Sequence, residues 1–145
     1  METQEEIKNR EVMRHLFLDG LNKRDLSLFD EVYAPDIHYH APKIEIDNLK
    51  DLRNLSNGYF SAFHDTEVTI NDLITKDDKV AIRFTFQGVH KEALQEIQPT
   101  GRKIKITGIS IYRLGNGKIV EEWEEFDQFG MMQQLGLELL PGEAV

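Results

Sequence analysis

The segment EEWEEFD, residues 121–127, places five carboxylates and two large aromatic side chains in seven consecutive positions. Apolar, β-branched residues precede it, so we expect a strand in which successive side chains alternate between two faces. On that basis Glu122 and Glu124 share one face with Val120 and Phe126. The opposite face carries Glu121, Trp123, Glu125 and Asp127.

If Val120 and Phe126 mark the inner face, the carboxyl groups of Glu122 and Glu124 point into the protein. Burial disfavours the charged form and raises a carboxyl pKa toward neutrality. Such a group can take up and return a proton at cellular pH. The alternative is that the segment is a solvated edge strand on which Trp123 packs alone. The sequence leaves both interpretations open.

The register of the last hairpin decides which residue faces these carboxylates. A two-residue turn at 116–117 would pair Ser110 with Trp123. A three-residue loop that includes Gly115 would instead pair Ser110 with Glu122 and keep the even-numbered face inward.

Three histidines are candidates for the same site. His38 and His40 share a face of a short strand expected at residues 37–40 and, with His90, could bring imidazoles to one pocket. There they would transfer protons or hydrogen-bond a substrate carbonyl. The alternative is that each is a half-buried residue hydrogen-bonded to the backbone. Two histidines at i and i+2 lack a fixed third ligand, and we predict no metal site.

Helices are expected before the sheet. Thr3 is a suitable N-cap for a helix whose apolar residues recur at helical spacing as far as Leu21. Asp25 can cap a second, short helix that must end before Pro35. Residues 48–63 show the same helical period, with Tyr59 and Phe63 on the apolar stripe.

Four long strands are expected at 66–74, 79–90, 102–114 and 118–126, joined mainly by short turns and therefore antiparallel. The second has one apolar face, which includes Phe86 and shares its parity with His90. The fold class is therefore α+β, with a twisted, cone-shaped antiparallel sheet wrapped around the N-terminal helices and an open mouth for a ligand. A short helix should follow at 128–135. We expect one domain over 1–145, with 137–145 as a mobile tail.

Composition excludes several classes of protein. The formal charge of −9 without clustered basic residues opposes nucleic-acid or anionic-membrane partners. The absence of cysteine excludes disulfides and thiolate chemistry. There is no apolar run long enough to cross a bilayer, and the charged N-terminus does not resemble a secretory signal. We therefore expect a cytoplasmic protein.

Short motifs occur in a distinctive order along nearly the whole chain. They are YAPDIHYHAP at 33–42, SAFHD at 61–65, GVH at 88–90, PTGR at 99–102, GISIYR at 108–113, GKIVEEWEEFD at 117–127 and QQLG at 133–136. In this order they resemble the SnoaL-type polyketide cyclases and ester cyclases of the nuclear-transport-factor-like superfamily. The resemblance implies a cone-shaped fold that needs no cofactor. It also implies ring closure by intramolecular aldol condensation, with an aspartate as acid/base and a nearby histidine.

Aligned on the final turn and QLG, the family's aspartate falls at Glu124 and its histidine at Ser110. Glutamate can perform the same proton transfer, whereas serine cannot replace imidazole as an acid. Asp127 and His90 match other family positions, and His40 matches the ester-cyclase branch. We therefore predict Glu124, Asp127 and His90 as catalytic. Substrate-binding residues are predicted to be His40, His38, Glu122, Ser110, Trp123, Tyr59, Phe63 and Phe86.

The leading functional hypothesis is a cofactor-independent enzyme that moves a proton on a small carbonyl or ester compound, by aldol-type cyclisation or isomerisation. The alternative is a non-catalytic small-molecule binding module, or an assembly domain that forms a homodimer through the sheet face carrying Trp123. The enzyme hypothesis requires Glu124 to line an apolar cavity. The module hypothesis requires it to be exposed or ion-paired, for instance with Arg83 or Arg113.

Overall fold

The computed structural model describes residues 1–138, so most of the tail expected at 137–145 lies outside the described residues. The helices are α1 (Gln4–His15), the π-helix η1 (Leu16–Leu21), the 3₁₀-helix η2 (Leu26–Leu28), α2 (Phe29–Val32), α3 (Leu49–Ala62) and α4 (Gln128–Gln134). The strands are β1 (Tyr33–Ala41), β2 (Ile44–Ile46), β3 (Phe63–Lys76), β4 (Lys79–His90), β5 (Lys103–Gly115) and β6 (Lys118–Phe126).

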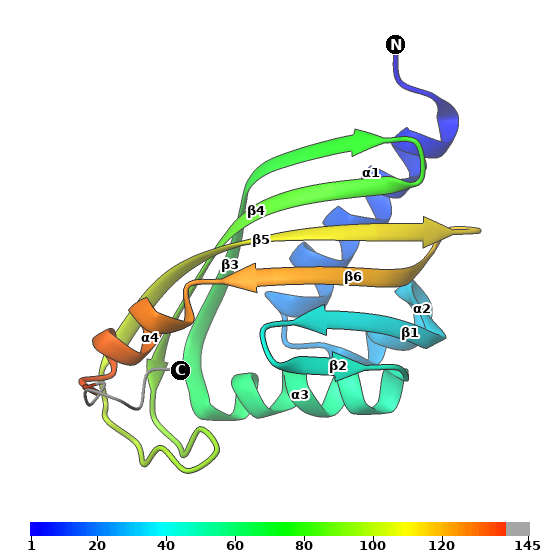
Figure 1. Ribbon diagram of the computed structural model, residues 1–145. Helices are drawn as coiled ribbons and strands as arrows, with labels where there is room; N and C mark the ends of the chain where they lie inside the picture. The colour runs from blue at the N-terminus through cyan, green and yellow to red at the C-terminus, as the bar shows by residue number, and fades with distance from the viewer. Residues whose placement is uncertain (139–145) are drawn as a thin grey trace.

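The strands form one sheet in the order β2-β1-β6-β5-β4-β3, and its two edge strands do not pair with each other. The long strands β3, β4 and β5 bend, and the sheet curves over α1 and α3 (Figure 1). Both helices contact the sheet, α1 at β3 and β4 and α3 at β1 and β3. The expected α+β fold, an open curved sheet around N-terminal helices, is confirmed.

One strand pairing was not anticipated. Neighbouring strands are antiparallel except β1 and β6, which pair in parallel, with His38 opposite Glu121 and His40 opposite Trp123. The short strand β2 continues the sheet beyond β1. A parallel pair joins segments that are far apart in sequence, so no local turn signal reveals it. This pairing brings the YAPDIHYHA segment beside the acidic strand.

The first helix begins as expected at Thr3. The Thr3 hydroxyl accepts a hydrogen bond from the Glu6 backbone at 3.1 Å, and the Glu6 carboxylate accepts one from the Thr3 backbone at 2.8 Å. Glu6 also accepts the backbone N–H of Asp77 at 2.8 Å. Backbone donation to this carboxylate lowers the Glu6 pKa. The capping box therefore also ties α1 to the turn between β3 and β4.

The helix expected to run to Leu21 changes to π-helical geometry after His15. The third helix ends at Ala62, and Phe63, expected as its last residue, instead begins β3. The final helix is present, and Gly136 follows it with a φ of 85°, the left-handed conformation that favours glycine. Within the described residues no helix is both long and apolar enough to span a bilayer.

Candidate functional site

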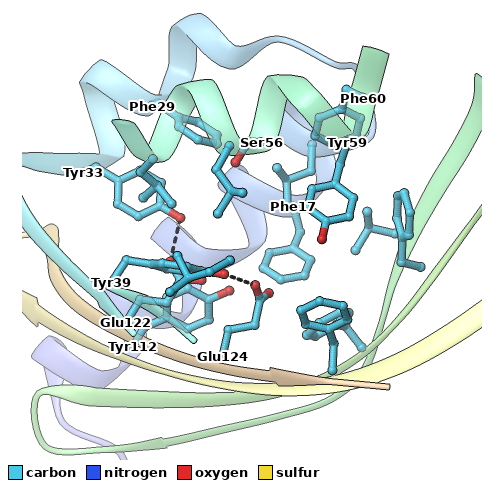
Figure 2. Close-up of a pocket in the computed structure, with 18 of the residues that line it drawn as sticks. Phe17, Phe29, Tyr33, Tyr39, Ser56, Tyr59, Phe60, Tyr112, Glu122 and Glu124 are labelled. Atoms are coloured by element: carbon cyan, nitrogen blue, oxygen red, sulfur yellow. Dashed lines mark hydrogen bonds between the residues drawn. The ribbon is translucent and has the colours of Figure 1, made fainter. Parts of the chain in front are cut away.

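A cavity of about 150 Å³ lies between the concave face of the sheet and the helices. Figure 2 shows its lining, to which β1, β6, β5 and α3 contribute labelled side chains. Six phenylalanines and all four tyrosines of the chain line it. The other polar lining residues are Ser56, Glu122 and Glu124. The cavity is thus strongly apolar, with two carboxyl groups as its only acidic lining residues within the part of the chain described here.

A β-bulge on β6 sets the register at these carboxylates. Gly115 pairs with Lys118 across a two-residue turn, but the pairing shifts by one residue before Arg113, which lies opposite Glu121. As a result Ser110 faces Glu124. Both registers predicted for Ser110 were wrong, because each assumed an unbroken ladder and the bulge adds one residue to β6.

Because of the bulge, Val120 does not mark the inner face of β6 as the sequence analysis expected. Ile119 is fully buried opposite Leu114, whereas Val120 is only half-buried. Glu122, Glu124 and Phe126 still line the cavity, since the normal alternation resumes after the bulge.

Glu122 occupies the deeper position, with only 4% of its surface exposed. The Tyr33 hydroxyl donates a hydrogen bond to its Oε1 at 3.0 Å. Burial raises the Glu122 pKa well above its usual value, and the charge of Glu124 raises it further, against the opposing effect of Tyr33 and Tyr112. Glu122 therefore keeps its proton to higher pH than an exposed glutamate does.

Glu124 lies nearer the cavity space and is half-buried. It accepts a hydrogen bond from the Tyr39 hydroxyl and a longer one, 3.5 Å, from Ser110 Oγ. Burial raises the Glu124 pKa, while the hydrogen bonds from Tyr39 and Ser110 oppose that rise. No lysine or arginine among the described residues lines the cavity to neutralise it.

The three tyrosines around the carboxyl pair are held in their neutral form. Burial, together with the charges of Glu122 and Glu124, raises the pKa values of Tyr33, Tyr39 and Tyr112. These phenols therefore act as hydrogen-bond donors. Two carboxyl groups on one face of a strand, with no nearby cation, strongly disfavour double ionisation, so the pair holds a proton to higher pH than isolated carboxyls would.

The predicted site residues divide between this cavity and other places. Glu122, Glu124, Tyr59 and Phe86 line it, and Ser110 is fully buried against Glu124. Phe63 lies outside the lining; its ring packs edge-on against Phe86, with centroids 5.8 Å apart.

His90 and Asp127, expected near the reacting groups, lie elsewhere. His90 is fully buried beyond Phe63, with ring centroids 5.3 Å apart, and its Nδ1 accepts the Thr100 backbone N–H at 3.2 Å. Alternation along β4 directs the His90 side chain inward, but His90 is the last residue of the strand and does not line the cavity. Asp127 is exposed and caps α4 by accepting the Gly130 N–H at 2.9 Å.

His38, His40 and Trp123 lie on the outer face of the sheet, so the expectation that they reach the pocket was wrong. His38 is exposed, and the His40 ring stacks on Trp123 with centroids 5.6 Å apart. The imidazole of His40 bridges Glu121 at 2.8 Å and Glu45 at 2.6 Å. The hydrogen bond with Glu121 is the main cause that raises the His40 pKa. Alternation along β1 directs Tyr39, between the two histidines, inward instead.

Tyr33, Tyr39 and Tyr112 are site residues that the sequence interpretation missed. Tyr112 shares its parity with Ser110 on β5, which could have indicated it. Tyr33 and Tyr39 depend on the parallel pairing of β1 with β6, for which the sequence carries no local signal.

The family model for the SnoaL-like polyketide cyclase matches residues 11–135. The chain belongs to this family. A search of curated proteins gave no match.

Several solved structures share the fold of this family member. A SnoaL-like polyketide cyclase, provisionally so described, from Jannaschia sp. CCS1 superposes with a TM-score of 0.88 at 16% identity, covering 96% of this chain and 99% of that one. IdmH of Streptomyces antibioticus, provisionally described as a polyketide cyclase, superposes with a TM-score of 0.77 at 27% identity. The match covers 89% of this chain and 99% of that one. AclR of Streptomyces galilaeus, provisionally described as a hydroxylase, superposes with a TM-score of 0.82 at 24% identity. The match covers 90% of this chain and 97% of that one. Proteins that share this fold are thus described either as polyketide cyclases or as a hydroxylase.

Proposed function

We propose that this family member is a cofactor-independent enzyme that removes and returns a proton beside the carbonyl group of a small, uncharged ketone or ester. The outcome is isomerisation or an aldol-type ring closure. The observation that carries the proposal is the position of Glu124, a carboxyl group with a raised pKa that borders an apolar cavity. A base with a pKa nearer to neutrality is better matched to reversible proton transfer at cellular pH.

The two carboxyl groups have different roles in this proposal. Glu122 is the more enclosed and retains its proton, so the negative charge resides on Glu124. Glu124 removes a proton from the carbon next to the carbonyl, and the electron pair of that C–H bond moves toward the carbonyl oxygen to give an enolate. An enolate conjugated with a neighbouring double bond takes the proton back at another carbon, which isomerises the compound. Alternatively, the enolate attacks a second carbonyl carbon, and the oxygen of that carbonyl takes the proton from Glu124 as the ring closes.

Ser110 occupies the position that the resemblance gives to a histidine, and it faces the proposed base directly. A serine hydroxyl orients the Glu124 carboxylate by hydrogen bonding but is too weak an acid to protonate a substrate oxygen. The proton returned to the product must therefore come from the carboxyl pair or from water.

The competing hypothesis of a non-catalytic binding module requires Glu124 to be neutralised or solvated. Arg83 pairs with Asp72 at 2.6 Å, and Arg113 pairs with Glu121 at 3.1 Å on the outer face. Neither guanidinium reaches Glu124, which favours the enzyme hypothesis over the module hypothesis.

The experiment is solvent deuterium exchange at the α-carbon, monitored by proton NMR in D₂O with acetophenone and cyclohexanone as uncharged probes. We expect the protein to accelerate exchange and Glu124→Gln to abolish the acceleration. Asp127→Asn is the matched control, because asparagine also caps helices and Asp127 lies outside the cavity; it should retain full activity. Equal exchange by wild type and Glu124→Gln would refute the proposal.

We also propose a homodimer through the outer sheet face. Ile109 and Ile111, on β5, are 53% and 41% exposed, and Ile111 lies opposite Trp123. An apolar patch of this kind on a sheet suits a self-complementary contact with a second copy. Light scattering should give the mass of a dimer for wild type and of a monomer for Ile111→Lys. A monomeric wild-type protein would contradict this proposal.

A further inference from the structure

One tyrosine of the cavity differs from the other three. The hydroxyls of Tyr33 and Tyr39 are directed to Glu122 and Glu124, and Tyr112 also interacts with Glu122. Among the described residues, no group hydrogen-bonds the Tyr59 hydroxyl, although Tyr59 lines the same cavity. The cavity therefore holds one phenol whose donor is available to a ligand.

Tyr59 lies on α3, on the wall of the cavity opposite the strand that carries Glu124. Figure 2 shows its hydroxyl directed into the cavity toward the side of Glu124. The Tyr59 ring packs edge-on against Phe126, with centroids 6.4 Å apart. Phe126 follows Glu124 by two positions on the same face of β6, so one packing contact fixes the phenol relative to the base.

We propose that Tyr59 donates a hydrogen bond to the carbonyl oxygen of the substrate while Glu124 faces the neighbouring carbon, and that the substrate is a ketone about the size of one ring. The proposal rests on the proposed function and adds to it a second substrate contact and a substrate class.

The cavity itself supports the substrate class. An apolar cavity of about 150 Å³ holds a molecule about the size of benzene. Its phenylalanine-rich lining favours an aromatic or alicyclic ring. The two carboxyl groups disfavour an anionic ligand. These features together match an uncharged aryl or cyclic ketone.

The proposed contact acts where charge develops in the reaction. When the α-carbon loses its proton to Glu124, the negative charge moves to the substrate oxygen. The Tyr59 hydroxyl stabilises that charge and keeps its own proton, because burial raises the Tyr59 pKa. A donor that is already in place and shielded from water has a larger effect on the rate than one in solution.

The test compares Tyr59→Phe with wild type in the acetophenone exchange assay. We expect Tyr59→Phe to lower the exchange rate by about 100-fold, the effect typical of losing one such donor. The pH profile should stay in place, because Tyr59 does not hydrogen-bond Glu124. Binding of toluene, an apolar ring without an oxygen, should be unchanged. A 3-fluorotyrosine at position 59, a stronger donor of nearly the same size, should accelerate exchange.

The possible outcomes separate this inference from the proposed function. If Tyr59→Phe exchanges acetophenone as fast as wild type while Glu124→Gln is inactive, the role of Tyr59 is refuted and the proposed function stands. If Tyr59→Phe loses toluene binding together with activity, and 3-fluorotyrosine gives no acceleration, Tyr59 has only a packing role. If wild type exchanges no ketone of any size, the proposed function itself fails. Exchange only of ketones larger than one ring would refute the substrate class.

Discussion

The hydroxyl of Tyr39 donates a hydrogen bond to the carboxyl group of Glu124 from the neighbouring strand β1. In the parallel ladder Tyr39 lies opposite Glu122, and its side chain reaches the next inward-facing carboxyl group. This bond opposes the effect of burial on the Glu124 pKa, whereas Glu122 is more enclosed and also experiences the charge of Glu124. The two glutamates thereby differ in acidity although they occupy the same cavity.

Replacement of Tyr39 by phenylalanine should make Glu124 a weaker acid. The lost hydrogen bond had lowered the Glu124 pKa, so that pKa rises in Tyr39→Phe and the acid limb of the pH–rate profile for α-proton exchange moves to higher pH. Tyr59→Phe serves as the control, since it should lower the rate without moving the limb. An acid limb that moves to lower pH, or does not move, would contradict the assigned hydrogen bond.

Replacement of Glu122 by glutamine should make stability less dependent on pH. Burial raises the folded-state Glu122 pKa above its unfolded value, so the contribution of Glu122 to stability is complete below pH 4.5 and is lost as pH rises through the folded pKa. Each unit of that rise costs about 1.4 kcal/mol at high pH. Urea unfolding at pH 5 and pH 8.5 should show a smaller loss for Glu122→Gln than for wild type. Parallel losses would count against a buried, protonated Glu122.

Replacement of His40 by glutamine should show the pH dependence of an ion pair on the outer face. Hydrogen bonds to Glu121 and Glu45 raise the His40 pKa, so its contribution is complete below pH 6.5 and is lost as pH rises through the folded pKa. Because His40 is partly exposed, His40→Gln should cost at most about 1 kcal/mol at pH 6 and little at pH 9. His38→Gln, at an exposed position on the same strand, should have no effect at either pH. Equal costs for both variants would be inconsistent with the bridging role of His40.

Two glycines provide a matched pair of stability tests. Gly108 lies opposite Phe84, and a Cβ atom there would meet the Phe84 ring and lie 2.8 Å from the Glu125 carbonyl oxygen. Gly108→Ala should therefore destabilise the protein by about 1–3 kcal/mol and displace a ring that lines the cavity. Gly58, on α3, has open space around that position, and Gly58→Ala should stabilise by about 1 kcal/mol. Calorimetric melting temperatures would test both, and a neutral Gly108→Ala would refute the close approach.

The parts of the fold with local signals were predictable. Thr3 with Glu6, and Asp25 with its helical turn, follow from capping chemistry, and the long strands follow from alternation and turn residues. The parallel pair of β1 and β6 was not predictable, because its residues are separated by most of the chain. The bulge near Val120 was also missed, because one extra residue in a ladder has no reliable sequence pattern.

For the candidate site, the sequence predicted which face of the sheet a side chain is on, but not how far along its strand the residue lies from the cavity. Alternation correctly directs Glu122 and Glu124 inward, and it gives His90 an inward face as well. His90 nevertheless lies beyond the cavity. Alternation gives the face of a side chain but not its position along the strand. On β1 alternation separates Tyr39 from His38 and His40 but does not say which set faces inward until the strand is paired.

The central claim, that Glu124 exchanges a proton from within an apolar cavity, is tested most directly by titrating its carboxyl carbon. Carbon-13 NMR of protein labelled at the glutamate carboxyl, with Glu124→Gln and Glu122→Gln to assign the two signals, reports each ionisation. The account predicts that both signals titrate above the usual glutamate value of 4.5, with Glu122 the last to lose its proton. A Glu124 signal that titrates at or below 4.5 would show a solvated or charge-paired carboxylate and would contradict the account.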